Sequence, residues 1–302
     1  MLIVGIGASA GGLEAFTQLL THLPLDTGMA FVLVQHLDPG HESALTQILS
    51  RATQLPVGEI THNQPVQANH VYIIPRDTNL TLVEGLLKLE ARGRTRMPHR
   101  PIDSFFESLA QDRRERAIGV VLSGTASDGT LGLEAIKADG GITFAQDGSA
   151  KYDSMPRSAV AAGCVDLVLS PADIAKELTR IAKHPYVAGR PLELPPRAKK
   201  DHEHAIAHQD DDQPLPSGGR GTAATGSRPA RDEAEQGEKD PASGPEDGYK
   251  KIMLLLRNHI GVDFSLYRSS TIQRRIARRI VLTRQHTLKG YARFLRGNTG
   301  EL

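Results

Sequence analysis

Cysteine and long hydrophobic runs are nearly absent from this sequence. One cysteine, Cys164, occurs among the 302 residues, so the chain can form no internal disulfide and has too few thiols for a cysteine-based zinc site. No apolar stretch approaches the roughly 20 residues of a membrane-spanning helix, and the strand-like residues 2–7 are too short for a signal peptide. We therefore expect a soluble, cytoplasmic protein that does not insert into a membrane.

Aromatic residues are also scarce, and charge is spread unevenly along the chain. From Tyr249 onward there are twelve basic residues and two acidic ones, whereas the preceding part is net acidic. Four arginines of this tail are spaced to form one basic stripe on a helix. The simplest interpretation of such a stripe is a helix face exposed to solvent. Because aromatic residues make up only 4% of the chain and no nucleic-acid-binding motif occurs, we expect no nucleic-acid partner. The stripe consists of Arg274, Arg275, Arg278 and Arg279.

Short runs rich in Val and Ile alternate with amphipathic stretches of helix length through residues 1–184. This alternation predicts βα units and an α/β fold with a doubly wound, mostly parallel sheet. Residues 71–75 and 78–91 predict a strand followed by a small antiparallel hairpin that turns at Glu84 and Gly85. The predicted parallel strands are 2–7, 30–35, 118–123, 141–146 and 165–170, and the predicted helices are 12–23, 41–53, 130–140 and 171–184.

Composition divides the chain into three parts. Residues 1–186 form the predicted α/β domain. Residues 187–248 consist mainly of Pro, Gly, Ala, Ser and charged residues, so they cannot bury enough apolar surface to offset the entropy of ordering, and we predict a disordered linker. Helical periodicity returns in residues 249–302, which predicts a small all-α tail.

A glycine-rich turn follows the first predicted strand. It reads GIGASAGG over residues 5–12, and a helix is predicted from about Leu13. Glycines permit a tight strand-to-helix turn and the helix N-terminus offers free N–H groups, so Ser9 is a candidate nucleophile. A phosphate-binding turn and a helix-capping serine are alternatives. A dinucleotide site is disfavoured, because the last glycine is one residue too far along and the second strand ends in Gln35 and His36 rather than an acidic residue.

Two further polar residues follow predicted parallel strands. His36 comes after strand 30–35, and Asp128 lies in a loop of small residues after strand 118–123. Taken alone, Asp128 could cap the helix that starts near residue 130. His36 could be a surface residue or could bind a metal with Asp38 and His41, although this spacing matches no helical ligand pattern.

Ser9, His36 and Asp128 nevertheless share the carboxyl edge of one predicted sheet, where ligands bind in open α/β folds. The three predict a catalytic triad: His36 would take the Ser9 proton and Asp128 would orient the imidazole, while backbone N–H groups near the turn would hold the oxyanion. The order Ser, His, Asp differs from that of the α/β-hydrolases. We expect no metal and no cofactor.

Five ordered segments resemble the catalytic domain of the chemotaxis protein-glutamate methylesterases. They are GIGASAGGLEAF, VQHLDPGHES, HRPID with the following FF, LSGTASDGTLG and MPRSAVAAGCVDLVL. The resemblance implies hydrolysis of glutamate γ-methyl esters on chemoreceptor signalling helices, and often deamidation of receptor glutamines. It implies Ser9, His36 and Asp128 as nucleophile, base and orienting acid, and methylated chemoreceptor helices as partner.

The chain departs from this family's pattern at two places beside the predicted triad. The family commonly has Ser-Thr-Gly-Gly at residues 9–12 and Gly-Met-Gly at residues 124–126, where this chain has Ala10 and the sequence GTA. Because the implied oxyanion donors are backbone groups, Ala10 and Thr125 remain candidates for that role. Ala126 is a more serious change if its φ must be positive. Further candidates for the substrate cleft are Glu14, Glu42, Arg76, Arg100 and Arg157.

Typical family members begin with a receiver domain that blocks the active site, and we expect this chain to lack that control. Residues 250–297 resemble the N-terminal helical domain of the chemotaxis receptor methyltransferases, without the domain that binds S-adenosylmethionine. We therefore expect a truncated esterase–methyltransferase fusion without methyl transfer, whose basic stripe is a candidate surface for acidic receptor helices. A catalytically idle scaffold that binds receptors or a sensor kinase is the alternative.

Overall fold

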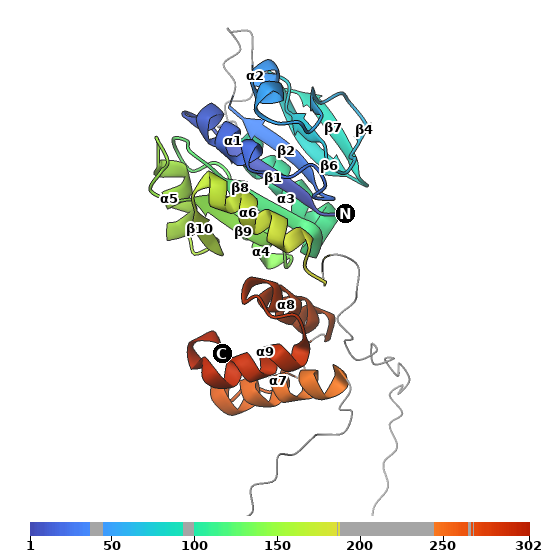
Figure 1. Cartoon of the computed structure of the whole chain (residues 1–302), viewed down its shortest axis with the longest axis vertical. Coiled ribbons are helices and arrows are strands. Elements are labelled where there is room, and N and C mark those ends of the chain that lie inside the picture. Colours follow the sequence, from blue (N-terminus) through green and yellow to red (C-terminus); the bar gives the residue numbers. More distant parts are fainter. Residues whose placement is uncertain (37–44, 93–99, 186, 188–244, 265–266, 268) are drawn as a thin grey trace, which may run out of the picture.

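The computed structural model describes residues 1–36, 45–92, 100–185, 187, 245–264, 267 and 269–302 (Figure 1). An α/β domain occupies the first 185 residues, and a group of helices follows at the C-terminal end. Within these residues no helix is both long and apolar enough to cross a bilayer.

A parallel sheet forms the centre of the α/β domain. Among the described residues it has seven strands in the order β10-β9-β8-β1-β2-β5-β3, and neighbouring strands pair in parallel. Strands β1, β8 and β9 are buried along their whole length, because helices cover both faces of the sheet. The predicted doubly wound, mostly parallel sheet is confirmed. The strands are β1 (Ile3–Ala8), β2 (Ala30–Gln35), β3 (Val57–Glu59), β5 (Val71–Ile73), β8 (Ala117–Val121), β9 (Ile142–Gln146) and β10 (Leu167–Leu169).

Two hydrophobic clusters lie on opposite faces of this sheet. One contains side chains from α1 (Gly12–Thr21), α2 (Leu45–Ala52) and α6 (Pro171–Ala182). The other contains side chains from α3 (Pro101–Arg113), α4 (Thr130–Ala138) and α5 (Ser154–Ala161). A short 3-10 turn, η1 (Arg114–Arg116), joins α3 to β8.

Helix α3 packs directly on β1 and explains two of the glycines in the motif GIGASAGG. A Cβ atom on Gly5 would lie 2.8 Å from Phe106, and one on Gly7 would lie 2.4 Å from Ile102. Gly5 and Gly7 therefore belong to the strand and make room for the helix. Only Gly11 has the positive φ, 74°, that a tight turn requires.

A small antiparallel sheet lies beside the main one, in the order β4-β7-β6 (Figure 1). Strands β6 (Thr78–Val83) and β7 (Leu86–Ala91) pair across a two-residue turn, and β4 (Gln64–Pro65) adds an edge. Glu84 and Gly85 have φ values of 53° and 77°, as a type I′ hairpin turn needs. The predicted hairpin is confirmed.

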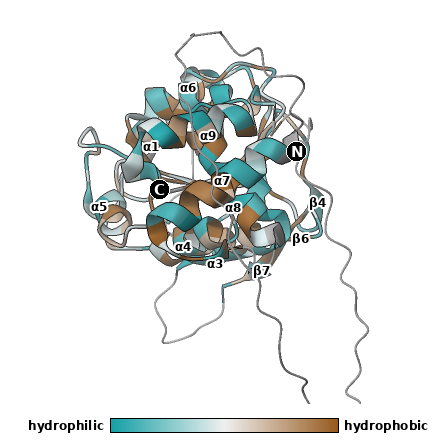
Figure 2. Ribbon diagram, turned by 90° about the horizontal axis from the view of Figure 1, so that it is seen from below, coloured by the Kyte–Doolittle hydropathy of each residue, from teal (hydrophilic) through white to brown (hydrophobic). Residues whose placement is uncertain are grey.

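The C-terminal helices have a hydrophobic cluster of their own, which includes Ile252, Ile276, Ile280, Tyr291 and Leu295. The colouring of Figure 2 shows that hydrophobic and hydrophilic residues alternate along these helices. The helix predicted from residue 249 begins earlier, at Pro245, and the predicted linker otherwise lies outside the described residues, apart from residue 187. The elements are α7 (Pro245–Ile260), α8 (Ser269–Leu282), α9 (Leu288–Gly297) and η3 (Thr299–Glu301).

Helix α8 contacts the α/β domain at the amino ends of its strands. Arg278 pairs with Asp166, which precedes β10, and its Nε donates to the carbonyl of Gly141, which precedes β9 (2.7 Å). Arg279 pairs with Glu301 in η3. These two arginines of the predicted basic stripe therefore take part in packing and are not a purely solvated face.

Candidate active site

Ser9 directly follows β1 and is held by the neighbouring strand β8. Its backbone N–H donates to the carbonyl of Ser123 (3.0 Å), the second residue after β8. The buried Ser123 hydroxyl in turn donates to the carbonyl of Ala10 (2.9 Å). Ser123 thus fixes the turn that carries Ser9, a role that nothing in its sequence neighbourhood indicated.

The loop after Ser123 lies against Ser9. A Cβ atom on Gly124 would be 3.1 Å from the Cβ of Ser9 and 2.1 Å from the Sδ of Met155, so a side chain does not fit there. The next residue is Thr125. Within the described part of the chain, the backbone N–H groups of Ala10 and Thr125 have no hydrogen-bond acceptor, which leaves both available to a ligand at Ser9.

Ala126 has a φ of 69°. This is the left-handed region, in which a residue with a Cβ atom is strained and glycine is not. Position 126 therefore has the positive φ at which the replacement of a glycine by alanine is a serious change.

His36 directly follows β2, beside Ser9. Ala8 and Gln35 are paired in the parallel register of β1 and β2, so Ser9 and His36 are the next residues on strands about 4.8 Å apart. The Nε2 atom of His36 lies 2.9 Å from the Oδ2 of Asp128. No hydrogen bond joins the Ser9 hydroxyl to His36 in the described residues, so strand register alone brings these two together.

Asp128 caps a helix, but not the one expected from the sequence. Its Oδ2 accepts the N–H of Ile102 (3.1 Å) and its Oδ1 accepts the N–H of Asp103 (2.9 Å), both in the first turn of α3. The cap of its own helix, α4, comes from Asp103, whose Oδ1 accepts the N–H groups of Gly129 and Gly132 (2.9 Å each). The two carboxylates therefore cap each other's helices, and the interpretation of Asp128 as the cap of α4 is wrong.

The environment moves the pKa values of these two buried carboxyls in opposite directions. Burial raises the pKa of Asp103 to about 6, against the N–H donors of Gly132 and Gly129, and the charge of Asp128 adds to the rise. Burial would also raise the pKa of Asp128, but the hydrogen bonds from His36 and from the backbone of α3 outweigh it, so that pKa is lowered. Asp128 is thus the carboxyl that stays ionised beside the His36 imidazole.

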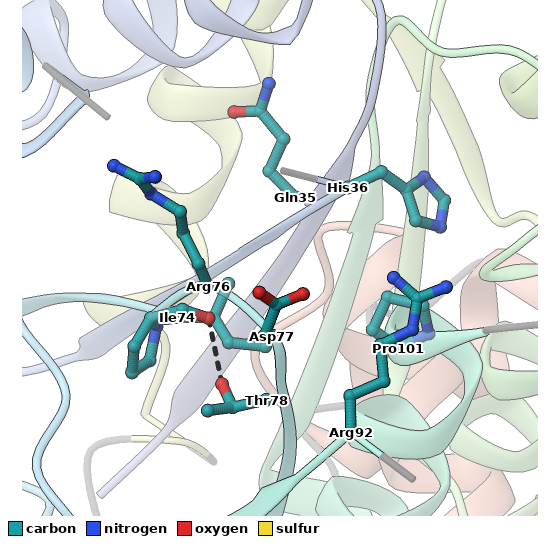
Figure 3. Close-up of a pocket in the computed structure, with 9 residues that line it drawn as sticks. Gln35, His36, Ile74, Arg76, Asp77, Thr78, Arg92 and Pro101 are labelled. Carbon is teal, nitrogen blue, oxygen red and sulfur yellow. Dashed lines mark hydrogen bonds between the residues drawn. The ribbon is translucent and has the colours of Figure 1, made fainter. Parts of the chain in front are cut away.

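A cavity of about 350 Å³ opens beside His36 (Figure 3). Arg76, a predicted cleft residue, lines it together with Arg92, which the sequence did not single out. Of the other predicted cleft residues, Glu14 is exposed on α1, Arg100 lies 3.7 Å from the Asp103 carboxylate, and Arg157 pairs with Asp153. Glu42 lies outside the described residues.

A metal site is not formed by the residues that the structure describes, because they contain no cluster of three or more His, Cys, Asp or Glu side chains suited to a metal ion. The alternative ligands Asp38 and His41 lie outside the described residues.

The chain matches two family models. One, described as CheB methylesterase, covers residues 4–178, and the other, described as CheR methyltransferase, all-alpha domain, covers residues 247–302.

Curated relatives and a solved structure agree with these matches. The chain is 36% identical over 181 residues to protein-glutamate methylesterase/protein-glutamine glutaminase 1 of Burkholderia pseudomallei, a match that covers 58% of this chain and 50% of that protein. It is 33% identical over 259 residues to an "Uncharacterized 104.1 kDa protein in hypE 3'region" of Rhodobacter capsulatus, covering 85% of this chain and 24% of that protein. The chain thus spans half or less of the length of these relatives.

The crystal structure of the Thermotoga maritima CheB methylesterase catalytic domain superposes with a TM-score of 0.56 at 30% identity, covering 60% of this chain and 98% of that one. The match to the first family model extends over more than half of the chain, and the three residues Ser9, His36 and Asp128 emerge from adjacent strands of the matching fold. The chain belongs to the CheB methylesterase family.

Proposed function

We propose that the chain hydrolyses glutamate γ-methyl esters on the cytoplasmic signalling helices of chemoreceptors, with Ser9 as nucleophile. The observation that carries the proposal is the 2.9 Å contact between His36 Nε2 and the buried, ionised carboxylate of Asp128. His36 follows β2, the strand that pairs with the strand leading to Ser9. The Burkholderia relative, named as a methylesterase and glutaminase, supports the choice of substrate and adds glutamine deamidation as a second reaction.

In this mechanism the Nδ1 atom of His36 is the base, because Nε2 is occupied by Asp128. His36 takes the Ser9 proton as the Ser9 oxygen attacks the ester carbonyl, and the N–H groups of Ala10 and Thr125 stabilise the oxyanion. The intermediate collapses to an acyl-enzyme and releases methanol, which takes the proton back from His36. Water then attacks the acyl-enzyme with His36 again as base, and free glutamate and Ser9 are restored.

The test is the release of methanol from a methylated receptor fragment. We expect Ser9→Ala to lower kcat by at least about a thousandfold, since the acyl-enzyme cannot form. Ser50→Ala is the matched control, because Ser50 is exposed on α2 and its hydroxyl donates to the Thr46 carbonyl of its own helix. Methanol release that persists in the Ser9 variant would refute the proposal and favour an idle receptor-binding scaffold.

A further inference from the structure

The cavity beside His36 lies between the main sheet and the small antiparallel sheet. Its lining includes Gln35 and His36 at the end of β2, Arg76 and Asp77 between β5 and β6, Arg92 after β7, and Pro101 at the start of α3. Because His36 is part of this lining, a group that occupies the cavity can lie beside the proposed catalytic base.

Backbone hydrogen bonds hold this lining in place. Ile74 N–H donates to the carbonyl of Leu33 (3.1 Å), which ties the end of β5 to the strand that leads to His36. The turn that follows is closed by Thr78 Oγ1, which donates to the carbonyl of Pro75 (2.8 Å; Figure 3). Arg92 N–H donates to the carbonyl of Asp77 (2.8 Å) and joins the segment after β7 to the one between β5 and β6.

Among the described residues, the lining of the cavity has more basic than acidic side chains. Arg76 and Arg92 contribute two guanidinium groups, and Asp77 contributes one carboxylate. In Figure 3 the Arg92 guanidinium extends toward His36, while the Arg76 guanidinium extends away from His36. Among the described residues, Arg92 has no carboxylate within ion-pair distance. Guanidinium groups bind carboxylates with two parallel hydrogen bonds, so the cavity is suited to an acidic side chain.

A neutral methyl ester does not need such a charge. On a helical substrate, however, side chains three or four residues from the ester lie on the same face, about 5–6 Å away. We propose that Arg76 and Arg92 form a specificity subsite for a carboxylate side chain one helical turn from the scissile ester. Methylated sites flanked by acidic residues are then preferred over neutral ones. This inference rests on the proposed esterase function.

The test compares two helical peptides that each carry one glutamate γ-methyl ester. One has glutamate at the positions three and four residues to either side, and the other has glutamine there. For the wild-type protein we expect kcat/KM for methanol release to be about tenfold higher with the acidic peptide, mainly through a lower KM. This ratio should fall as salt concentration rises, because the cavity is open to solvent.

In the Arg76→Ala/Arg92→Ala double variant the ratio should fall to about one. Arg51→Ala, which removes an exposed arginine on α2, should keep the wild-type ratio. The single variant Arg92→Glu should favour a third peptide with lysine at the flanking positions, and this inversion tests the subsite even if the double variant is unstable.

Wild-type protein that hydrolyses the acidic and neutral peptides equally, or a double variant that keeps the preference, would overturn the subsite while leaving the esterase proposal intact. The esterase proposal itself fails if the wild-type protein releases no methanol from any of the peptides, or if release persists in Ser9→Ala.

Discussion

At the scale of single residues, Ala126 has a strained backbone conformation and directly follows Thr125, the predicted oxyanion donor. Its φ of 69° is a conformation that glycine adopts without strain. We expect Ala126→Gly to raise the free energy of unfolding by about 1 kcal/mol, as measured by urea denaturation, without lowering kcat/KM. Ala162→Gly is the control: Ala162 has a φ of −71°, so glycine should lower stability there. A loss of stability in Ala126→Gly would contradict the interpretation.

The three proposed triad residues could be found from the sequence because strand order determines where they emerge. Parallel strands end at one edge, so Ser9, His36 and Asp128 were expected together without any knowledge of distances. Asp103, Ser123 and Arg92 could not be found in this way. Each acts on a residue at least 15 positions away along the chain, through backbone contacts that only the folded structure creates.

At the scale of secondary-structure elements, helix α3 was the main element that the sequence left unassigned. Its buried apolar residues follow the i, i+3, i+4, i+7, i+8 spacing of an amphipathic helix, so the helix could have been predicted from the pattern, whereas its packing on β1 and α4 could not. These residues are Ile102, Phe105, Phe106, Leu109 and Ala110. This helix connects the proposed triad to the packing of the domain, because its first turn supplies two N–H donors to Asp128 and its Asp103 carboxylate caps α4.

The exchange of caps between α3 and α4 predicts that the free energy of unfolding depends on pH through Asp103. Because burial raises the pKa of Asp103 from 3.8 to about 6, the folded protein holds this proton more tightly than the unfolded chain does. The stabilisation that the proton provides is fully present below about pH 4 and is lost as the pH rises through about 6. Asn at this position stays neutral and keeps an oxygen for Gly129 and Gly132. We therefore expect Asp103→Asn to exceed wild type in unfolding free energy by about 2 kcal/mol at pH 7.5, but by little at pH 4.5.

Urea denaturation at these two pH values measures the effect. Asp26→Asn removes the same charge from an exposed position and serves as the control. An Asp103→Asn protein that is less stable than wild type at pH 7.5 would show that the Asp103 charge stabilises the cap, contrary to the argument.

At the scale of the whole molecule, the C-terminal helices and the candidate active site lie at opposite edges of the sheet. Ser9 and His36 follow the carboxyl ends of β1 and β2, whereas Gly141 and Asp166, which bind Arg278, precede β9 and β10. The contact also includes Arg180, which donates to the carbonyl of Val281 (2.9 Å). Docking of α8 therefore leaves the catalytic edge uncovered by the C-terminal helices.

Arg278 is the residue on which this docking can be tested, because its side chain is only 11% exposed and that of Asp166 only 4%. Without Arg278 the buried Asp166 carboxylate keeps only the more distant Lys137 ammonium, 3.9 Å away, as a cation among the described residues, and the loss of one partner of a buried pair costs up to about 3 kcal/mol. We expect Arg278→Ala to speed hydrogen exchange in α8 by at least about tenfold, as measured by mass spectrometry, while exchange in β1 and the kcat/KM for ester hydrolysis stay unchanged. Arg275→Ala, on an exposed position of the same helix, should change neither. If exchange in α8 does not respond to Arg278→Ala, this ion pair does not hold the helix on the domain; if hydrolysis slows, the two edges of the sheet are coupled after all.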